Sequence, residues 1–442
     1  MDQDLEDFSA LFGRASESGG RDPEFEAKLR RRHRRRRIVA GSIALVIVAA
    51  VATYLPLTLL ATAGGATVSV TRPQVVVPAA AALALPTSGE SAVSVAGADA
   101  YLGADGLLAS SGGNGALPIA SISKLITALV ILDAKPLGAS DVGPTITFAK
   151  ADVALYDKYY VLDATVSPMK TGSTMSEKDA IATILVASAC NYAEAVANWA
   201  FGSNAGYVSA VKKWLAAHAL AGTKLYEPTG IDPRNVSTPS DLIAIGKLAI
   251  ANPVVATMVG SPYVSVGTVG TIVNTNSLLG SDGITGIKTG TLASAGSCLL
   301  FSGLVDVGTG APLTIVGIVL GGFSRSSVNS DVRALITSLQ SGFHEVNLVK
   351  KGDVIGRYAT PWKDDAVVVA SQDASVLTWS NTPVTSTVTT RALSTGKTGT
   401  RVGSLTFAAG TSKVAVPLEL KGAIAGPDGW WRVTHPNQLL KK

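Results

Sequence analysis

Hydrophobic residues recur at spacings of three and four between residues 118 and 132, and no Gly or Pro interrupts them until after Ala134. This period predicts a helix. Another helix is expected from Ser176, which forms a capping-box pattern with Asp179, and further helices over residues 208–220 and 239–251. From Ile284 the pattern changes to three strand-like runs, and residues 327–343 return to a helical period. Strands flanking a helical block predict one mixed α/β domain over residues 86–345.

The last hundred residues have a different pattern. Short β-rich runs such as VVVASQDASVLTW and KVAVPLEL alternate with turn residues. This arrangement predicts a small all-β domain over residues 350–438.

Residues 38–60 contain no charged side chain, and this length is enough to span a bilayer as a helix. Eight Lys or Arg residues precede it within residues 28–37, so the positive-inside rule places residues 1–37 in the cytoplasm. Residues 61–85 then form an extracytoplasmic linker rich in Ala, Val, Thr and Pro. The alternative is a cleaved signal peptide, since residues 61–63 resemble a cleavage site. The long charged stretch and the long hydrophobic run favour an uncleaved anchor.

The formal net charge of +5 over 442 residues could suggest a nucleic-acid partner. Because the excess lies in the arginine run, the rest of the chain is nearly balanced, and no nucleic-acid face is predicted. Cys190 and Cys298 are the only cysteines, which excludes a disulfide scaffold and a multi-cysteine zinc site. Two buried free thiols are favoured over a single bridge between them. Neither a metal nor a cofactor is expected.

The candidate chemistry begins with Ser121 and Lys124 at the start of the first predicted helix. Positions i and i+3 share a helix face, so the lysine amine can reach the serine hydroxyl. Burial of this apolar helix would desolvate the lysine and favour its neutral form, which can accept the serine proton. The pair is therefore a candidate nucleophile and base.

The same S-x-x-K spacing occurs at three other places, so spacing alone proves little. Only the Ser121 pair opens a strongly apolar helix and is followed by two further motifs in order. The other pairs are Ser167/Lys170, Ser209/Lys212 and Ser394/Lys397.

The second motif is SACN, residues 188–191, where the Ser188 hydroxyl would have to lie over the catalytic lysine. Its alternative interpretation is a small residue at a helix break. The third motif is Lys288-Thr289-Gly290-Thr291, at the end of an apolar strand. A strand edge of this kind offers a cation, two hydroxyls and a backbone N–H to a carboxylate and an oxyanion. The K-T-G triplets that begin at Lys170 and Lys397 lack this context.

S-x-x-K, then a serine motif, then K-T-G on a strand is the signature of penicillin-recognising serine acyl-enzymes. Residues 85–345 resemble the D-alanyl-D-alanine carboxypeptidases, the low-molecular-weight penicillin-binding proteins, particularly the actinobacterial kind. The stretches that carry the resemblance are PIASISKLITA, LVASACN, YEPTGIDPRNVSTPSDL, VNTNSLLG and GIKTGTLASAGSCLLFSG. The C-terminal β-rich part, with WWRVTHP near its end, looks like the family's C-terminal module.

The resemblance implies a β-lactamase/transpeptidase-like fold and removal of the terminal D-Ala from peptidoglycan stem peptides, in cell wall maturation. It implies that Ser121 is the acylated nucleophile, Lys124 its base and Ser188 the proton relay. It further implies that β-lactams are inhibitors and that the enzyme is a single-pass protein of the cell membrane with its catalytic domain outside. By the same resemblance, Lys288, Thr289 and Thr291 hold the substrate carboxylate, and the N–H groups of Ser121 and Thr291 form the oxyanion hole.

One position departs from the family pattern. The third residue of the second motif, usually Asn, is Cys190, and Asn191 follows it. A thiol is a weak donor and cannot supply the hydrogen bonds of a carboxamide. Either turnover is low, or Asn191 takes the role through a one-residue shift.

Two competing functions are considered. A β-lactamase-like hydrolase would need a second base for deacylation, and Glu194 and Glu227 are the only glutamates between the second and third motifs. The sequence around Glu227 fits the carboxypeptidase pattern better. The other alternative, suggested by Cys190, is a catalytically weak scaffold protein at the membrane.

Overall fold

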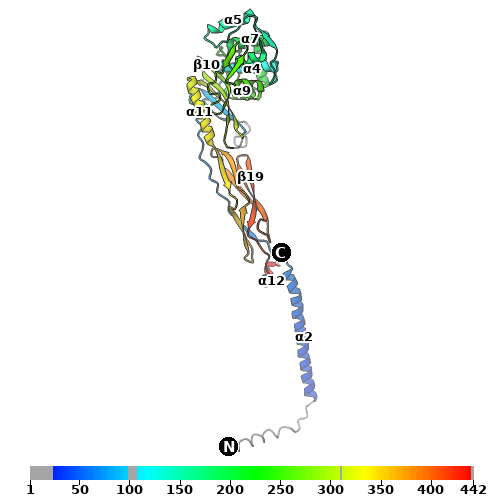
Figure 1. The fold of residues 1–442 in the computed structure, drawn as a ribbon. Helices are drawn as coiled ribbons and strands as arrows, with labels where there is room; N and C mark the ends of the chain where they lie inside the picture. Colours follow the sequence, from blue (N-terminus) through cyan, green and yellow to red (C-terminus); the bar gives the residue numbers. More distant parts are fainter. Residues whose placement is uncertain (1–22, 98–106, 309–310, 440–442) are drawn as a thin grey trace, which may run out of the picture.

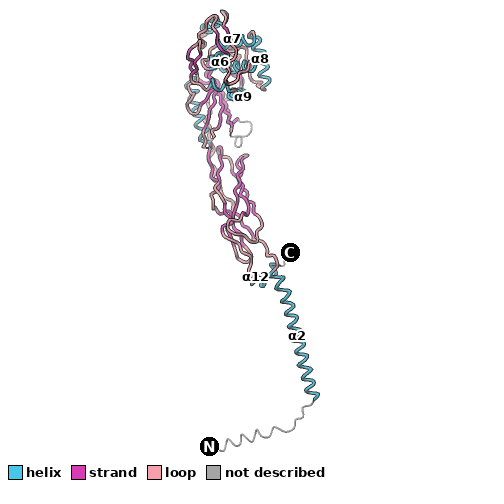
Figure 2. The backbone as a smooth tube through the Cα atoms, turned by 45° about the vertical axis from the view of Figure 1, so that its right-hand side comes forward, coloured by secondary structure: helices cyan, strands magenta, loops and turns pink. Residues whose placement is uncertain are grey.

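The computed structural model describes residues 23–97, 107–308 and 311–439. The molecule is elongated, with a mixed α/β region (residues 90–342) at one end and helix α2 (Pro23–Leu59) at the other (Figure 1). A β region (residues 343–421) lies between them, and Figure 2 shows that it consists mostly of strands. Of the expected cytoplasmic tail, residues 1–22 lie outside the described residues, and residues 23–37 form the first part of α2.

The α/β region is built on a five-stranded antiparallel sheet with the order β10-β11-β12-β2-β3. The strand β10, which carries the K-T-G motif, is therefore at an edge. The bounds are β2 Glu90–Ala96, β3 Leu107–Ser111, β10 Ile284–Leu292, β11 Gly296–Val305 and β12 Leu313–Gly322.

Alternate side chains of the central strands enter two separate cores, as expected for a sheet covered on both faces. Leu300 faces the helical block, whereas its neighbour Phe301 faces helix α11 (Arg325–Gly342). Helix α9 (Pro239–Ala251) lies directly on the first face: a Cβ on Gly246 would be 2.6 Å from Val316. The sheet is thus held rigidly between α9 and α11.

Helix α4 (Ser123–Ala134) forms the centre of the helical block. Every residue from Ser123 to Leu132 is buried, because α4 contacts helices α6 to α9. The expectation of an apolar helix packed into a core is confirmed. The other elements of the block are β4 Leu117–Pro118, η1 Ala120–Ile122, β5 Thr145–Thr147, α5 Lys150–Tyr160, β6 Thr174–Ser176, α6 Glu177–Leu185, α7 Cys190–Phe201, α8 Asn204–Ala217, β7 Val236–Ser237, α10 Pro253–Val259, β8 Tyr263–Val266 and β9 Gly270–Val273.

The helix expected from Ser176 is in fact two helices, α6 and α7, so this prediction was wrong in its extent. The cap is as expected, since Ser176 Oγ accepts a hydrogen bond of 3.1 Å from the N–H of Asp179. The chain leaves the helix before Ser188, which has a φ of 61°, and α7 begins at Cys190. A residue with this φ cannot continue a right-handed helix.

The β region contains most of a six-stranded antiparallel sheet with the order β1-β14-β15-β19-β18-β17, and a separate β13–β16 pair. Strand β1 (Thr67–Val70) comes from the segment expected to be a linker and pairs with β14 (Val354–Ala359). The remaining bounds are β13 Phe343–Val349, β15 Asp365–Ala370, β16 Ala374–Trp379, β17 Val384–Thr390, β18 Arg401–Ala409, β19 Ser412–Lys421, α12 Gly429–Thr434 and α13 Pro436–Leu439.

Among the described residues, Ala27–Leu59 of α2 is long and apolar enough to cross a membrane, with a mean hydropathy of 2.4 over its most apolar window. The pair α9 and α10 also passes a test of length and composition, but it is bent by 101° and its apolar residues belong to the core of the α/β region. The membrane candidate is therefore α2.

Candidate active site

Ser121 lies in the 3₁₀ turn η1, which leads directly into α4. The Lys124 amine is 2.9 Å from Ser121 Oγ, the contact that the i and i+3 spacing predicts. The same amine donates a 2.7 Å hydrogen bond to the carbonyl oxygen of Thr229. Lys124 is fully buried. The structure therefore contains a serine hydroxyl with an enclosed amine beside it, which is the arrangement an activated nucleophile needs.

The partner of Lys124 belongs to a loop that is organised by one carboxylate. Glu227 accepts hydrogen bonds from Thr229 N (2.7 Å), Thr229 Oγ1 (2.6 Å) and Gly230 N (2.6 Å). It also accepts from Asp232 N (3.3 Å) and Asn235 Nδ2 (3.0 Å). These five bonds fix residues 227–235, which we call the Glu227 loop.

The Glu227 loop lies directly against the nucleophile turn. Gly230 has a φ of +87°, and a Cβ there would be 1.9 Å from the carbonyl oxygen of Ala120. Only glycine allows this approach. Because both oxygens of Glu227 already accept from the loop, Glu227 holds the loop and is not a free base beside the serine.

Strand β10 passes the nucleophile turn on another side. A Cβ on Gly290 would be 2.9 Å from the carbonyl oxygen of Ile119 and 3.4 Å from the nitrogen of Ser121. The glycine of the K-T-G motif therefore lets the edge strand touch the turn that carries the nucleophile. This contact brings the first and third motifs together.

Lys288 and Ser188 form a second lysine–serine pair, which joins the second and third motifs. Lys288 Nζ donates to Ser188 Oγ at 2.9 Å and to its neighbour Thr289 O at 3.2 Å. Both residues are almost completely buried. The left-handed φ of Ser188 is uncommon for a residue with a side chain, and it turns the chain between α6 and α7 where this serine meets the lysine.

The environment of Lys288 disfavours its ammonium form. Burial lowers the pKa of Lys288 well below that of an ordinary lysine, and the positive charges of Lys124 and Arg325 lower it further. Cys190 acts in the opposite direction. An anion bound beside Lys288 would offset the repulsion and favour the charged amine.

The two threonines of the third motif each have a polar partner. Thr289 Oγ1 is 2.6 Å from Thr275 Oγ1, and Thr291 Oγ1 accepts a 3.1 Å hydrogen bond from Arg325 Nε. Sequence reasoning missed Arg325. Arg325 is the first residue of α11, and it lies close to the motif because β12 returns the chain to this end of the sheet. No local sequence pattern could have predicted this contact.

Cys190 and Asn191 occupy different surroundings at the start of α7. The Asn191 side chain is fully buried, and its carboxamide is used by one residue: it accepts from Ser167 N at 3.1 Å and donates to Ser167 O at 2.8 Å. Cys190 is also buried and lies close enough to Lys288 to affect its charge. Asn191 is therefore tied to a neighbouring loop, whereas Cys190 lies near enough to Lys288 to influence its pKa. Both Cys190 and Cys298 are free and buried, as favoured from the sequence.

The other S-x-x-K and K-T-G matches lie away from this constellation. In the Ser167/Lys170 pair, Lys170 is exposed. The backbone N–H of Ser167 donates a hydrogen bond to the Asn191 side chain. Ser394 and Lys397 are exposed in the β region. The described structure thus brings together Ser121, Lys124, Ser188, Lys288, Thr289 and Thr291, all of the candidates from the sequence.

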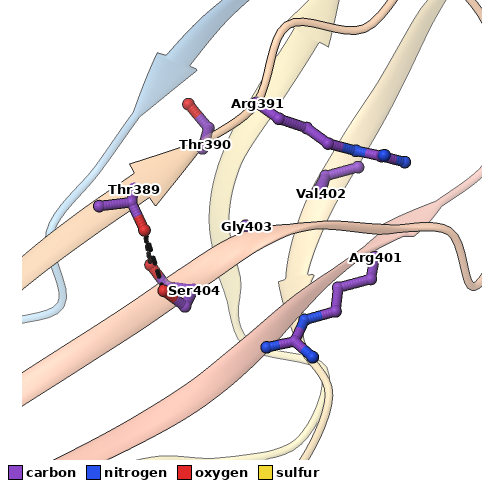
Figure 3. Close-up of a pocket in the computed structure, with 7 residues that line it drawn as sticks. All are labelled: Thr389, Thr390, Arg391, Arg401, Val402, Gly403 and Ser404. Carbon is purple, nitrogen blue, oxygen red and sulfur yellow. Dashed lines mark hydrogen bonds between the residues drawn. The ribbon is translucent and has the colours of Figure 1, made fainter.

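The two largest of the described hollows lie outside the serine site. One of about 580 Å³ is bordered by the Glu227 loop, Lys158, Tyr159 and Glu194, and its charges are paired as Lys158–Glu194 and Arg234–Asp232. The other, of about 610 Å³, lies on strands β17 and β18 of the β region (Figure 3). The side chains of Arg391 and Arg401 extend from it in different directions, and it contains no nucleophile with a base. Within the described ranges, no three His, Cys, Asp or Glu side chains cluster as metal ligands.

Comparison with known proteins identifies the constellation. The family model described as D-alanyl-D-alanine carboxypeptidase matches residues 102–319, which include all three motifs. The chain belongs to this family of serine penicillin-binding proteins. As a D-alanyl-D-alanine carboxypeptidase family member, it is a serine-type D-Ala-D-Ala peptidase.

Two curated relatives cover the same part of the chain. A D-alanyl-D-alanine endopeptidase of Escherichia coli is 28% identical over 238 residues, which are 51% of this chain and 70% of the relative. A D-alanyl-D-alanine endopeptidase of Pseudomonas aeruginosa is 29% identical over 235 residues, again 51% and 70%. The relatives of this family member thus share the domain that carries the motifs.

Solved structures show the same fold. Penicillin-binding protein 6B of Escherichia coli has a TM-score of 0.54 at 19% identity and covers 79% of this chain and 98% of its own. Penicillin-binding protein 5 of Haemophilus influenzae has a TM-score of 0.53 at 18% identity, with 81% and 100% covered. The expected α/β transpeptidase-like fold is confirmed.

Proposed function

We propose that this chain removes the terminal D-Ala of peptidoglycan stem peptides through an acyl-enzyme on Ser121. The observation that carries the proposal is the 2.9 Å contact between Ser121 Oγ and the enclosed amine of Lys124. In the first step Lys124 takes the proton of Ser121, and the oxygen attacks the carbonyl carbon of the penultimate D-Ala. The N–H groups of Ser121 and Thr291 receive the oxyanion. The peptide C–N bond then breaks, and the proton that Lys124 accepted passes through Ser188 to the departing amine, which returns Lys124 to its neutral form.

Hydrolysis completes the cycle. A water molecule loses a proton to Lys124 and attacks the ester carbonyl, and the serine oxygen leaves as the hydroxyl. The shortened peptide is then released with a free carboxyl group. In this scheme Lys288, assisted by Thr289 and Thr291, binds the terminal carboxylate of the substrate. The positive charge of Arg325 at this end of β10 supports that role, and a bound carboxylate would favour the ammonium form of Lys288.

A β-lactamase-like activity has less support. Such an enzyme needs a second base placed to activate the deacylating water. Glu227 is fully engaged in its loop, and Glu194 is paired with Lys158. We therefore expect β-lactams to act as slowly released inhibitors.

The proposed setting is the outer face of a cell membrane. In this arrangement α2 crosses the bilayer once, with the arginine run in the cytoplasm and the α/β and β regions outside. Residues 61–85 connect the helix to the rest, residues 86–345 are the catalytic domain and residues 350–438 the C-terminal domain. The apolar length of α2 and the basic residues before it support this topology.

The test is the release of D-Ala from a peptide that ends in D-Ala-D-Ala, with the Ser121→Ala variant as control. Release by the wild type and none by the variant is the expected result. The curated relatives are named endopeptidases, so the same assay should include a cross-linked dimer with an internal D-Ala bond. Cleavage of the dimer alone would overturn the carboxypeptidase assignment.

A further inference from the structure

The C-terminal helix α12 packs against the last two turns of α2. Tyr54 Oη donates a 2.5 Å hydrogen bond to the carbonyl oxygen of Val433. Arg432 Nη1 donates to the carbonyl oxygens of Leu59 (3.2 Å) and Ala61 (2.6 Å). The carbonyl groups at the end of a helix have no partner within it. Arg432 therefore caps α2, and α12 lies beside the C-terminal end of α2 (Figure 1).

The contact has a defined depth along α2. A helix rises about 1.5 Å per residue, so Tyr54 is roughly 7 to 8 Å below Leu59 along the axis. If α2 spans the bilayer as proposed, these residues occupy the outermost part of the span. Helix α12 then lies at the boundary between the acyl chains and the lipid headgroups.

Tryptophans gather at this end of the molecule. Trp430 of α12 is 77% exposed. Its neighbour Trp431 packs edge-on against Trp362, with ring centroids 5.5 Å apart, and stacks on His435 at 4.8 Å. Three of the six tryptophans of the chain are thus placed around one short helix. Tryptophan is enriched at membrane interfaces because its ring is amphipathic.

The connection between α2 and the β region is too short to let this surface move away from the membrane. Only residues 61–66 separate Leu60 from strand β1, which is paired with β14. Six extended residues span at most about 20 Å. The surface that carries the exposed tryptophan consequently stays close to the end of α2.

We propose that α12 enters the headgroup layer of the leaflet from which α2 emerges, with Trp430 as the inserted side chain. The β region then rests on the membrane and holds the α/β region at a fixed height above it. The occupant of this surface is lipid. The inference rests on the transmembrane part of the proposed function and is independent of the serine chemistry.

The test uses the full chain in lipid nanodiscs that contain a doxyl quencher either near the headgroup or at the end of the acyl chain. Tryptophan fluorescence should be quenched by the shallow label more than by the deep one. Trp430→Phe should remove most of the shallow quenching. Trp214→Phe, which replaces a buried tryptophan of the α/β region, should leave it unchanged.

Equal shallow quenching in the wild type and Trp430→Phe would overturn the proposal, as would no shallow quenching in either. A dimer in detergent that Trp430→Phe converts to a monomer would also overturn it, because the occupant would then be a second copy. Release of D-Ala measured in the same nanodiscs separates this failure from a failure of the proposed activity.

Discussion

The site contains two buried lysine–serine pairs with the same separation and different support. In both pairs the amine is 2.9 Å from a serine hydroxyl. Lys124 is held by a second hydrogen bond of 2.7 Å to Thr229, whose loop is fixed by five bonds to one carboxylate. Lys288 has only a longer bond of 3.2 Å to a neighbouring carbonyl.

The difference in hydrogen bonding between the two lysines fits two different roles. The first pair has a fixed geometry, which suits proton transfer to and from one hydroxyl. The second pair has a depressed pKa at Lys288 and neighbouring positive charges, and these suit a change of charge state when an anion binds. We therefore expect variants of the first pair to abolish chemistry and variants of the second to alter which substrates are handled.

The largest effect is expected for Ser121→Ala. This change should abolish covalent labelling by a fluorescent penicillin, because Ser121 is the proposed nucleophile and Ser188, the serine beside the other enclosed amine, is assigned to proton transfer. The measurement is in-gel fluorescence after incubation with the labelled drug. Ser394→Ala removes an exposed serine of the β region with the same S-x-x-K spacing and should not change labelling. Labelling that survives the first change would place the nucleophile elsewhere.

Lys288→Ala should discriminate between substrates. We expect kcat/KM to fall by about 10- to 150-fold more for a peptide ending in D-Ala-D-Ala than for the same peptide with an amidated C-terminus. A charge-assisted hydrogen bond is worth roughly 1.5 to 3 kcal/mol. Lys397→Ala, in an exposed K-T-G triplet of the β region, is the matched control. Equal losses on both substrates would remove Lys288 from carboxylate binding.

Glu227→Gln tests the support of the first pair. The amide keeps one acceptor oxygen but points an NH₂ group at backbone donors, so Thr229 should shift away from Lys124. Loss of one charge-assisted bond of about 1.5 kcal/mol predicts a roughly tenfold slower acylation by penicillin. The noncovalent binding constant should change little. Glu345→Gln, on the β region, is the control. An unchanged acylation rate would show that the loop tolerates the defect.

The pH dependence of KM tests the role of the second pair. Because the pKa of Lys288 is lowered, its ammonium is lost at a lower pH than for an ordinary lysine. Raising the pH should therefore increase KM for the carboxylate substrate relative to the amidated one. The ratio of the two KM values isolates this effect from the titration of groups needed for both substrates. In Lys288→Ala the ratio should no longer depend on pH.

The sequence predicted the parts of this site that depend on local pattern. Ser121 and Lys124 share a helix face, and the K-T-G motif lies at the end of an apolar strand-like run, so both could be found from the local sequence. Three features could not be found in this way, because each depends on residues that only the fold brings together. They are the hydrogen bonds that Glu227 accepts within the Glu227 loop, the position of Arg325, and the contact between α12 and α2.

The break between α6 and α7 was considered only as the alternative interpretation of the SACN motif. The apolar residues on either side keep a helical period, so the hydrophobic pattern continues through a segment whose backbone does not. Only the left-handed φ of Ser188 shows the interruption. Strand β1 was missed for a related reason, since its short polar and apolar alternation becomes a strand only when β14 supplies a partner.

The smallest effect concerns the start of α7, where the cysteine replaces the residue usual in the family. Both ends of the Asn191 carboxamide are held by the backbone of Ser167. Asn191→Ala should consequently act through folding, since two buried backbone groups of Ser167 lose their partner at about 1 to 3 kcal/mol each. A fall in Tm should accompany any fall in activity.

Cys190→Asn should instead raise the rate of D-Ala release. The carboxamide would supply a hydrogen bond near Lys288 and the substrate backbone that a thiol cannot make. One recovered bond of roughly 1 to 1.5 kcal/mol sets a ceiling of about tenfold. Cys298→Asn is an unsuitable control because that thiol is packed in the core, so Cys298→Ser serves better. If Cys190→Asn leaves the rate unchanged while Asn191→Ala lowers it without a change in Tm, then Asn191 is the functional residue and the bonds to Ser167 are broken when substrate binds.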